Sequence, residues 1–241
     1  MHELDKIRCV WEHNGNDTLL YAVDYPGAYA RGCCLQEAVE KMRTEIPAFC
    51  TWACIPAPVP CEIEISQDAS CELQVRDADS DVLFTWERDP LSLEEYNHLK
   101  ELTLHSAEDF LNLYTSIPDK NRAARPNRTT FYGAVPRTAD EMYLHTKNVN
   151  AYYFGEIGVE TDNAGTILEC RRRGFEQLEQ QADFLENPVA EGSYGELWTL
   201  RKVLRRFIWH DRIHARAMYR MAVELFGWER IHDVFQFGGM I

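Results

Sequence analysis

The 241-residue chain lacks any run of about 18 consecutive apolar residues, the length that a membrane-spanning helix requires. Its opening residues, MHELDKIRCVWEH, contain no apolar stretch behind a basic segment, which a secretion signal would have. These two absences predict a soluble protein of the cytoplasm that has no membrane partner. In that reducing compartment the eight cysteines are expected to be free thiols and not disulfides.

Basic residues are also scarce, because 25 Lys and Arg stand against 39 Asp and Glu, giving a net charge of −14. A chain of this charge repels phosphate backbones, so the composition disfavours a nucleic-acid partner. The sequence has no Gly-rich phosphate loop, no G-x-S-x-G nucleophile elbow and no Rossmann fingerprint. It also lacks the two C-x2-C pairs of a zinc ribbon, so the motifs CC (33–34) and CTWAC (50–54) are interpreted as small buried apolar residues.

The hydrophobic pattern changes near residue 90, which we take as a domain boundary between residues 1–90 and 91–241. The first part carries short strand-like runs and turn residues, whereas the second part has the spacing of long helices. Acidity is concentrated in the first part, which holds 7 basic and 17 acidic residues, against 18 and 22 in the second.

The first part is predicted to be a small α+β domain. The runs IRCVWEH and LLYAVDY flank the turn sequence NGND, which indicates a β-hairpin. Apolar residues at helical spacing predict a helix over residues 35–49. After the break IPAPVP, the segments CEIEIS and CELQV are expected to form two further strands, joined by the loop QDAS.

The stretch YAVDYPGAYARGCCLQEAVEKMRTEIPAF resembles the HicB-like family, and the resemblance covers about residues 5–85. It implies a small antiparallel sheet with one helix. The family's usual DNA-binding tail is not visible in this sequence. The function expected of this domain is therefore to bind a protein partner.

The second part is expected to form four helices, over residues 92–117, 138–158, 165–186 and 196–227, which suit an all-α four-helix bundle. Two of their starts have the spacing of a capping box, in which the side chains of a Ser or Thr and a Glu satisfy free amides. These pairs are Ser92 with Glu95 and Thr138 with Glu141.

Three histidines occupy the apolar seams of two of these helices. On the last helix, alternating spacings of three and four residues select Leu200, Val203, Phe207, His210, His214, Ala217 and Met221. The same spacing on the second helix selects Met142, His145, Val149 and Tyr152. His105 lies beside the seam of the first helix, where it would be at most a rim residue.

A buried imidazole without a partner costs roughly 1–3 kcal/mol, so three of them together need a hydrogen-bond partner or a metal. Residues four apart on a helix have Cβ atoms about 5–6 Å apart, which lets His210 and His214 reach one ion while His145 supplies a third nitrogen. This pattern predicts one divalent transition metal, zinc or nickel. The alternative is that they are ordinary core or surface histidines.

The segments TADEMYLHTKNVNAYYF and ELWTLRKVLRRFIWHDRIHARAMYR resemble the DinB-like (DinB/YfiT) family of metalloproteins. The resemblance covers about residues 92–230 and implies a four-helix bundle with a three-histidine metal site. The family pattern, one His on the second helix and H-x3-H on the fourth, corresponds to His145, His210 and His214. Some relatives are thiol-dependent S-transferases or related isomerases, and some form homodimers.

Several neighbouring residues are candidates for supporting roles. Glu141 and Asp211 are placed to orient the imidazoles, unless they are solvated carboxylates on a helix face. Tyr152, and after it Tyr143 and Tyr153, are candidates for a pocket wall, unless they are core aromatics. The RRRG run at 171–174 is expected on the exposed side of the third helix. The arginines of the last helix are expected mostly to decorate its outer flanks, solvated or paired with acids, with an anionic substrate or partner as the second interpretation: these are Arg201, Arg205, Arg206, Arg212, Arg216 and Arg220.

Two classes of function remain open from the sequence. One is a metal-dependent enzyme, a transferase acting on a small-molecule substrate with a low-molecular-weight thiol, because an open divalent site lowers the pKa of a bound thiol or water. The other is a binding or regulatory protein, in which the HicB-like domain engages a protein partner and the metal is structural. An open site favours the enzyme, and a sealed site favours the binding protein.

Overall fold

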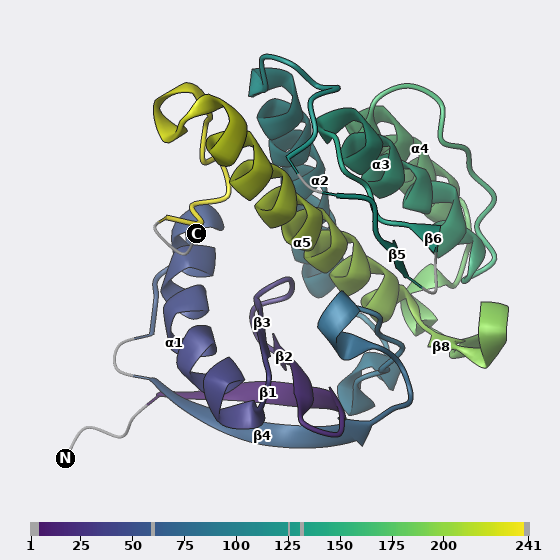
Figure 1. Cartoon of the computed structure of the whole chain (residues 1–241). Helices are drawn as coiled ribbons and strands as arrows, with labels where there is room; N and C mark the ends of the chain where they lie inside the picture. The colour runs from purple at the N-terminus through teal and green to yellow at the C-terminus, as the bar shows by residue number, and fades with distance from the viewer. Residues whose placement is uncertain (1–4, 59–60, 125, 131–132, 239–241) are drawn as a thin grey trace. The chain divides into compact units, whose positions relative to one another are not determined.

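The computed structural model describes residues 5–58, 61–124, 126–130 and 133–238. By the contacts between its residues the chain divides into two compact units, Met1–Arg88 and Asp89–Ile241. The first unit is a small sheet with a helix, and the second is mainly helical (Figure 1). No described helix combines the length and the apolar character needed to cross a membrane.

The first unit is built on a four-stranded sheet in the order β3-β2-β1-β4. Its strands are β1 Asp5–Asn14, β2 Asp17–Ala22, β3 Tyr29–Gly32 and β4 Cys61–Ser70. The predicted hairpin is confirmed, since β1 and β2 pair antiparallel across the tight turn at residues 15–16. Helix α1, Leu35–Trp52, packs against β2, β3 and β4 and buries Ala38, Met42, Ile46 and Phe49.

Two features of this sheet differ from the prediction. The sheet is mixed and not antiparallel, because β4 pairs parallel to β1 after the crossover through α1. The loop predicted over QDAS belongs to β4, whereas the strand predicted at 71–75 is wrong, since the chain there turns into the short 3-10 helix Val75–Asp77. The alternation of apolar residues identified strand-forming segments but carried no information about the partner of each strand.

The second unit has four α-helices in its described residues: α2 Leu93–Ser116, α3 Ala139–Gly155, α4 Ile167–Leu178 and α5 Leu200–Phe226. α2 packs against α5 and α4, and α3 packs against the same two helices (Figure 1). Two short hairpins, of Thr129–Thr130 with Gly133–Ala134 and of Ala190–Glu191 with Leu197–Trp198, join the helices.

The helix starts follow the sequence closely. Ser92 and Thr138 form the predicted capping boxes, and a third box at Thr166 with Glu169 begins α4. The third and fourth helices are shorter than predicted, because α4 ends at Leu178 and α5 begins only at Leu200. Their apolar faces meet in one core: Leu91, Tyr96, Tyr153, Phe154, Val159, Phe175, Leu178, Trp198, Leu200, Val203, Leu204 and Phe207.

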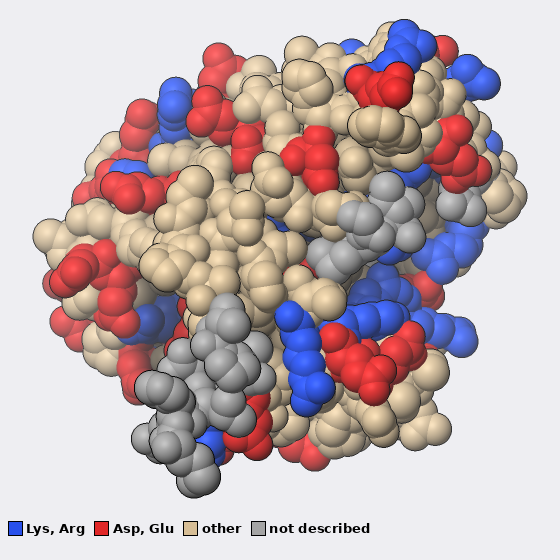
Figure 2. All heavy atoms as spheres, turned by 90° about the vertical axis from the view of Figure 1, so that its left-hand side faces the viewer, with Lys and Arg blue, Asp and Glu red and all other residues tan. Residues whose placement is uncertain are grey.

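The charged side chains differ from the predicted placement in this core. Arg205, Arg206 and Arg212 are buried and do not decorate an outer flank, and Arg171, the first residue of the RRRG run, is completely buried. The guanidinium group of Arg171 lies over the ring of Phe207, and that of Arg212 lies over the rings of Phe235 and Phe237. On the face shown in Figure 2, the Lys and Arg side chains that remain outside lie among Asp and Glu side chains.

The cysteines also divide between two environments. Cys50 is buried, as its interpretation as a small apolar residue predicts, and Cys9 and Cys170 are buried as well. That interpretation is wrong for Cys33, Cys34 and Cys54, which are exposed. Cys33, Cys34, Cys54, Cys71 and Cys170 are free thiols.

Candidate metal centre

The candidate centre lies where α3 and α5 meet. α5 carries His210 and His214 one helical turn apart, and α3 carries His145. The ring centres of His210 and His214 are 4.4 Å apart, and the ring of His145 is 5.2 Å from His210 and 4.6 Å from His214. The two helices predicted to supply imidazoles therefore bring all three rings together.

The ligand atoms are close enough for one ion. One ring nitrogen from each histidine lies within 4.8 Å of the others. Nitrogen ligands around a tetrahedral zinc lie about 2.0–2.1 Å from the ion, so small rotations of the side chains bring all three into coordinating range. Among the described residues, no other group of three or more His, Cys, Asp or Glu has this proximity.

The three side chains differ in exposure, and this corrects one expectation. His210 is buried and His214 is half-buried, but His145 is exposed, although its ring lies beside those of the other two. The buried face of α3 instead contains Met142, Tyr143, Thr146, Asn150, Tyr153 and Phe154. His145 lies at the edge of this face, so the group of imidazoles opens to solvent on the α3 side.

The surroundings keep these imidazoles neutral, which is the form that binds a metal. Burial, with a smaller contribution from the neighbouring His145, lowers the pKa of His214 to about 3. Burial also places the pKa of His210 well below its usual value, with further contributions from the charges of His214, His145 and Arg206. His145 is exposed as a residue, but the protein around its ring removes part of the surrounding water, and this lowers the pKa of His145 as well.

An unsatisfied polar atom in this group agrees with a ligand role. The Nδ1 atom of His210 is buried and has no hydrogen-bond partner. A buried nitrogen left without a partner costs free energy, and the great majority of such groups in proteins are satisfied. A cation bound by the three rings would interact with the lone pairs of their nitrogens, so the residues fit a divalent metal.

The residues expected to orient the imidazoles have other partners. Glu141 caps α3, where its Oε2 accepts hydrogen bonds from the amides of Arg137 at 2.7 Å and Thr138 at 3.2 Å. Asp211 is buried on another face of α5, where its carboxylate accepts a hydrogen bond from Ser106 Oγ at 2.5 Å and pairs with Arg171.

The tyrosines are placed differently from one another. Tyr152 is exposed on α3, with its ring 6.1 Å from that of Trp198. Tyr153 is buried, and its ring centre is 5.9 Å from that of His210, where it forms one wall behind the imidazole. Tyr143 is buried, and its hydroxyl accepts a hydrogen bond from the amide of Ile167. His105 is half-buried and lies 3.1 Å from Asp109 on its own helix.

A buried ion pair that the sequence pattern did not predict joins Arg171 and Asp211. Both side chains are fully buried, and each guanidinium nitrogen of the pair lies 3.3 Å from a carboxylate oxygen. The apolar stripe of α4, Ile167, Cys170, Gly174, Phe175 and Leu178, includes position 171 at helical spacing. That spacing was the signal that could have placed Arg171 inside.

Comparison with known proteins adds no relative to this description: no family model, no curated protein and no solved structure significantly matches the chain.

Proposed function

We propose that the second unit is a DinB-like four-helix bundle that binds one divalent transition metal, zinc or nickel, through His145, His210 and His214. The observation that carries this proposal is the convergence of three imidazoles within 4.8 Å of one another, with a buried Nδ1 atom that lacks a partner. The resemblance of residues 92–230 to the DinB-like family supports the same ligand set.

The exposure of His145 favours an enzyme over a structural metal site. Structural zinc sites are closed by four protein ligands, whereas catalytic sites use three and keep a position for water or substrate. Here the protein offers three imidazoles, and their α3 side is exposed. A bound divalent metal would supply Lewis-acid chemistry, which lowers the pKa of a thiol or water that reaches it.

The protein groups around the site have separate roles in this proposal. His210, which is buried, and His214, which is half-buried, form the floor of the site, and Tyr153 excludes water behind His210. Tyr152 is exposed on α3, seven residues after His145, and we propose that its hydroxyl donates a hydrogen bond to a substrate. We propose a transfer reaction between a low-molecular-weight thiol and a small electrophilic substrate, in the cytoplasm.

A turnover screen tests the reaction. Zinc- and nickel-loaded protein and metal-stripped protein are mixed with low-molecular-weight thiols and electrophiles, and loss of the free thiol is followed. We expect turnover in the loaded protein, and none in the stripped protein or in His145→Ala. Metal binding without turnover would instead favour a binding protein, in which the first unit engages a protein partner.

A further inference from the structure

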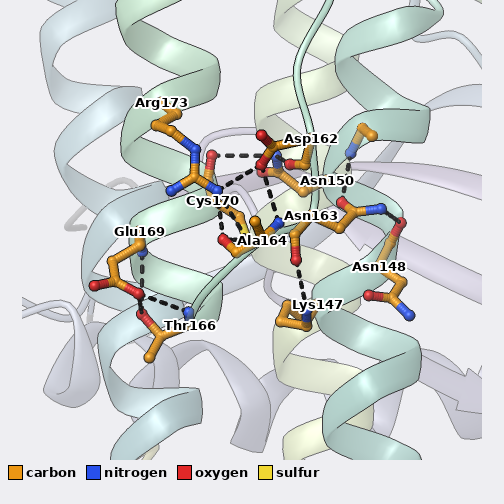
Figure 3. A network of polar contacts seen from close by, with 11 residues as sticks. Lys147, Asn148, Asn150, Asp162, Asn163, Ala164, Thr166, Glu169, Cys170 and Arg173 are labelled. Carbon is orange, nitrogen blue, oxygen red and sulfur yellow. Dashed lines mark hydrogen bonds and ion pairs between the residues drawn. The ribbon is translucent and has the colours of Figure 1, made fainter.

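The loop between α3 and α4 is hydrogen-bonded to the turn of α3 that follows His145. The side chain of Asn163 donates a hydrogen bond from Nδ2 to the carbonyl of Asn148 at 3.0 Å, and its Oδ1 accepts one from the amide of Ala151 at 3.0 Å (Figure 3). Both backbone groups belong to α3, within two turns of His145. One side-chain amide thus fixes two points on the helix that supplies the third imidazole.

The loop that carries Asn163 is itself held on both sides. Lys147 Nζ on α3 donates to the carbonyl of Asn163 at 2.6 Å (Figure 3). From α4, Arg173 donates to Asp162 Oδ1 at 2.6 Å, and the same Oδ1 accepts from the amide of Ala164 at 2.9 Å. Asn163 therefore projects from a backbone that both helices restrain.

Further hydrogen bonds link α3 directly to α4. The buried Asn150 donates from Nδ2 to the carbonyl of Cys170 at 3.1 Å and to that of Asp162 at 3.2 Å. The Tyr143 hydroxyl accepts from the amide of Ile167 at 3.1 Å. All these contacts join α3 to the loop and α4, while the ring of His145 approaches α5.

The geometry of the metal site is sensitive to the position of α3, because α3 supplies one ligand while α5 supplies the other two. His210 and His214 lie one turn apart on a single helix, so their spacing is set by the helix itself. His145 comes from another helix, and a shift of α3 by one residue, about 1.5 Å along its axis, would exceed the tolerance of about 0.2 Å for a metal–ligand distance. The geometry of the site therefore requires α3 to be fixed in height and rotation.

We infer that Asn163 is a positioning residue, which holds α3 so that His145 meets His210 and His214 before a metal arrives. This inference rests on the proposed metal site. Asn163 does not touch the imidazoles, and it acts through the backbone of α3. A preorganised ligand set binds an ion more tightly than one that must be assembled.

The test compares Asn163→Ala with Ser92→Ala, which removes a capping side chain on α2 and serves as a matched, destabilised control. Zinc affinity is measured by competition with a chromophoric chelator, and the visible spectrum of the cobalt(II) protein reports the ligand set. We expect Asn163→Ala to weaken zinc binding by about 10–100-fold, as for other groups that orient ligands, and to shift the cobalt spectrum toward that of His145→Ala. Ser92→Ala is expected to keep the wild-type affinity and spectrum.

Asn163→Asp provides a second variant of nearly the same size. It keeps an acceptor for Ala151 but loses the donor to Asn148, so we expect it to weaken zinc binding in the same direction. Wild-type zinc affinity and cobalt spectra in folded Asn163→Ala and Asn163→Asp would overturn the positioning role and leave the proposed metal site intact.

A measurement on the metal-free protein separates this inference from the proposed function. In wild-type protein, with ring centres 4.6 Å apart, we expect a nuclear Overhauser effect between the ring protons of His145 and His214. The effect is expected to be lost in Asn163→Ala and kept in Ser92→Ala. If wild-type protein bound no zinc, the proposed function would fall, while persistence of this effect in Asn163→Ala would still refute the positioning role.

Discussion

The imidazole rings of His145 and His214 lie 4.6 Å apart, although they come from different helices and differ in exposure. His214 is half-buried on α5, and His145 is exposed at the edge of α3. This pairing places a neutral, nitrogen-rich site at the margin of the helical unit, where a substrate can reach it. The predictions below follow from this placement and from the packing that supports it.

The metal-free protein is expected to lose stability as the pH falls below about 6.5. In the unfolded chain the histidines take up protons near their ordinary pKa of about 6.5, whereas burial lowers the pKa of His214 in the folded protein to about 3. The unfolded state therefore binds more protons between these values, so this contribution to stability is complete above pH 6.5 and is lost as the pH falls toward 3.

Urea denaturation in the presence of a chelator, at pH 7 and pH 5, measures this loss. We expect the free energy of unfolding to fall by on the order of 1–2 kcal/mol, and to fall less in His214→Gln, whose side chain does not titrate. Equal pH dependence in the two proteins would show that the imidazole of His214 is not kept neutral by folding.

The buried pair of Arg171 and Asp211 predicts a strong asymmetry between single and double substitutions. Asp211→Ala leaves the buried guanidinium of Arg171 without its carboxylate, so we expect a loss of about 3–5 kcal/mol in the free energy of unfolding. The double variant Arg171→Met with Asp211→Leu removes both charges, and most of the stability should return. Denaturation midpoints of the wild type, Asp211→Ala and the double variant check this, and a double variant no more stable than Asp211→Ala would contradict it.

The close approach of α3 and α4 at Gly174 makes this glycine hard to replace. A Cβ atom added there would lie 2.1 Å from Cε2 of Phe154, so Gly174→Ala must move an aromatic ring of the core. We expect a net loss of about 1–3 kcal/mol in thermal or urea unfolding, despite the better helix propensity of alanine.

Gly155, near the end of α3, is the matched control for this substitution. No heavy atom of the neighbouring protein lies within 4 Å of a Cβ atom added at Gly155. Gly155→Ala is therefore expected to be neutral or to stabilise the protein by up to about 1 kcal/mol. Similar effects of the two substitutions would show that α3 and α4 are not in close contact at Gly174.

The sequence predicted those features that depend on local chemistry. The capping boxes at Ser92 and Thr138 marked the starts of α2 and α3, because one side chain and one amide three residues away are enough to form them. The H-x3-H spacing of His210 and His214 likewise fixed their proximity, since both lie on one helix.

Features that depend on distant parts of the chain were predicted less well. The parallel pairing of β4 with β1 is decided by the crossover through α1, which no local pattern records. Arg171 and Arg212 were expected at the surface because they are charged, but both are buried. Burial is possible because Arg171 pairs with the carboxylate of Asp211 and because both guanidinium groups lie over aromatic rings. The exposure of His145 depends on how α3 packs, and helical spacing alone did not give that rotation.

The most direct test of the metal site is elemental analysis of protein purified without a nickel column and dialysed against zinc. The wild-type protein is expected to retain about one zinc ion per chain, and His145→Ala and His210→Ala to retain much less, whereas His105→Ala, altered outside the site, should match the wild type. Wild-type zinc content in both His145→Ala and His210→Ala would contradict the account.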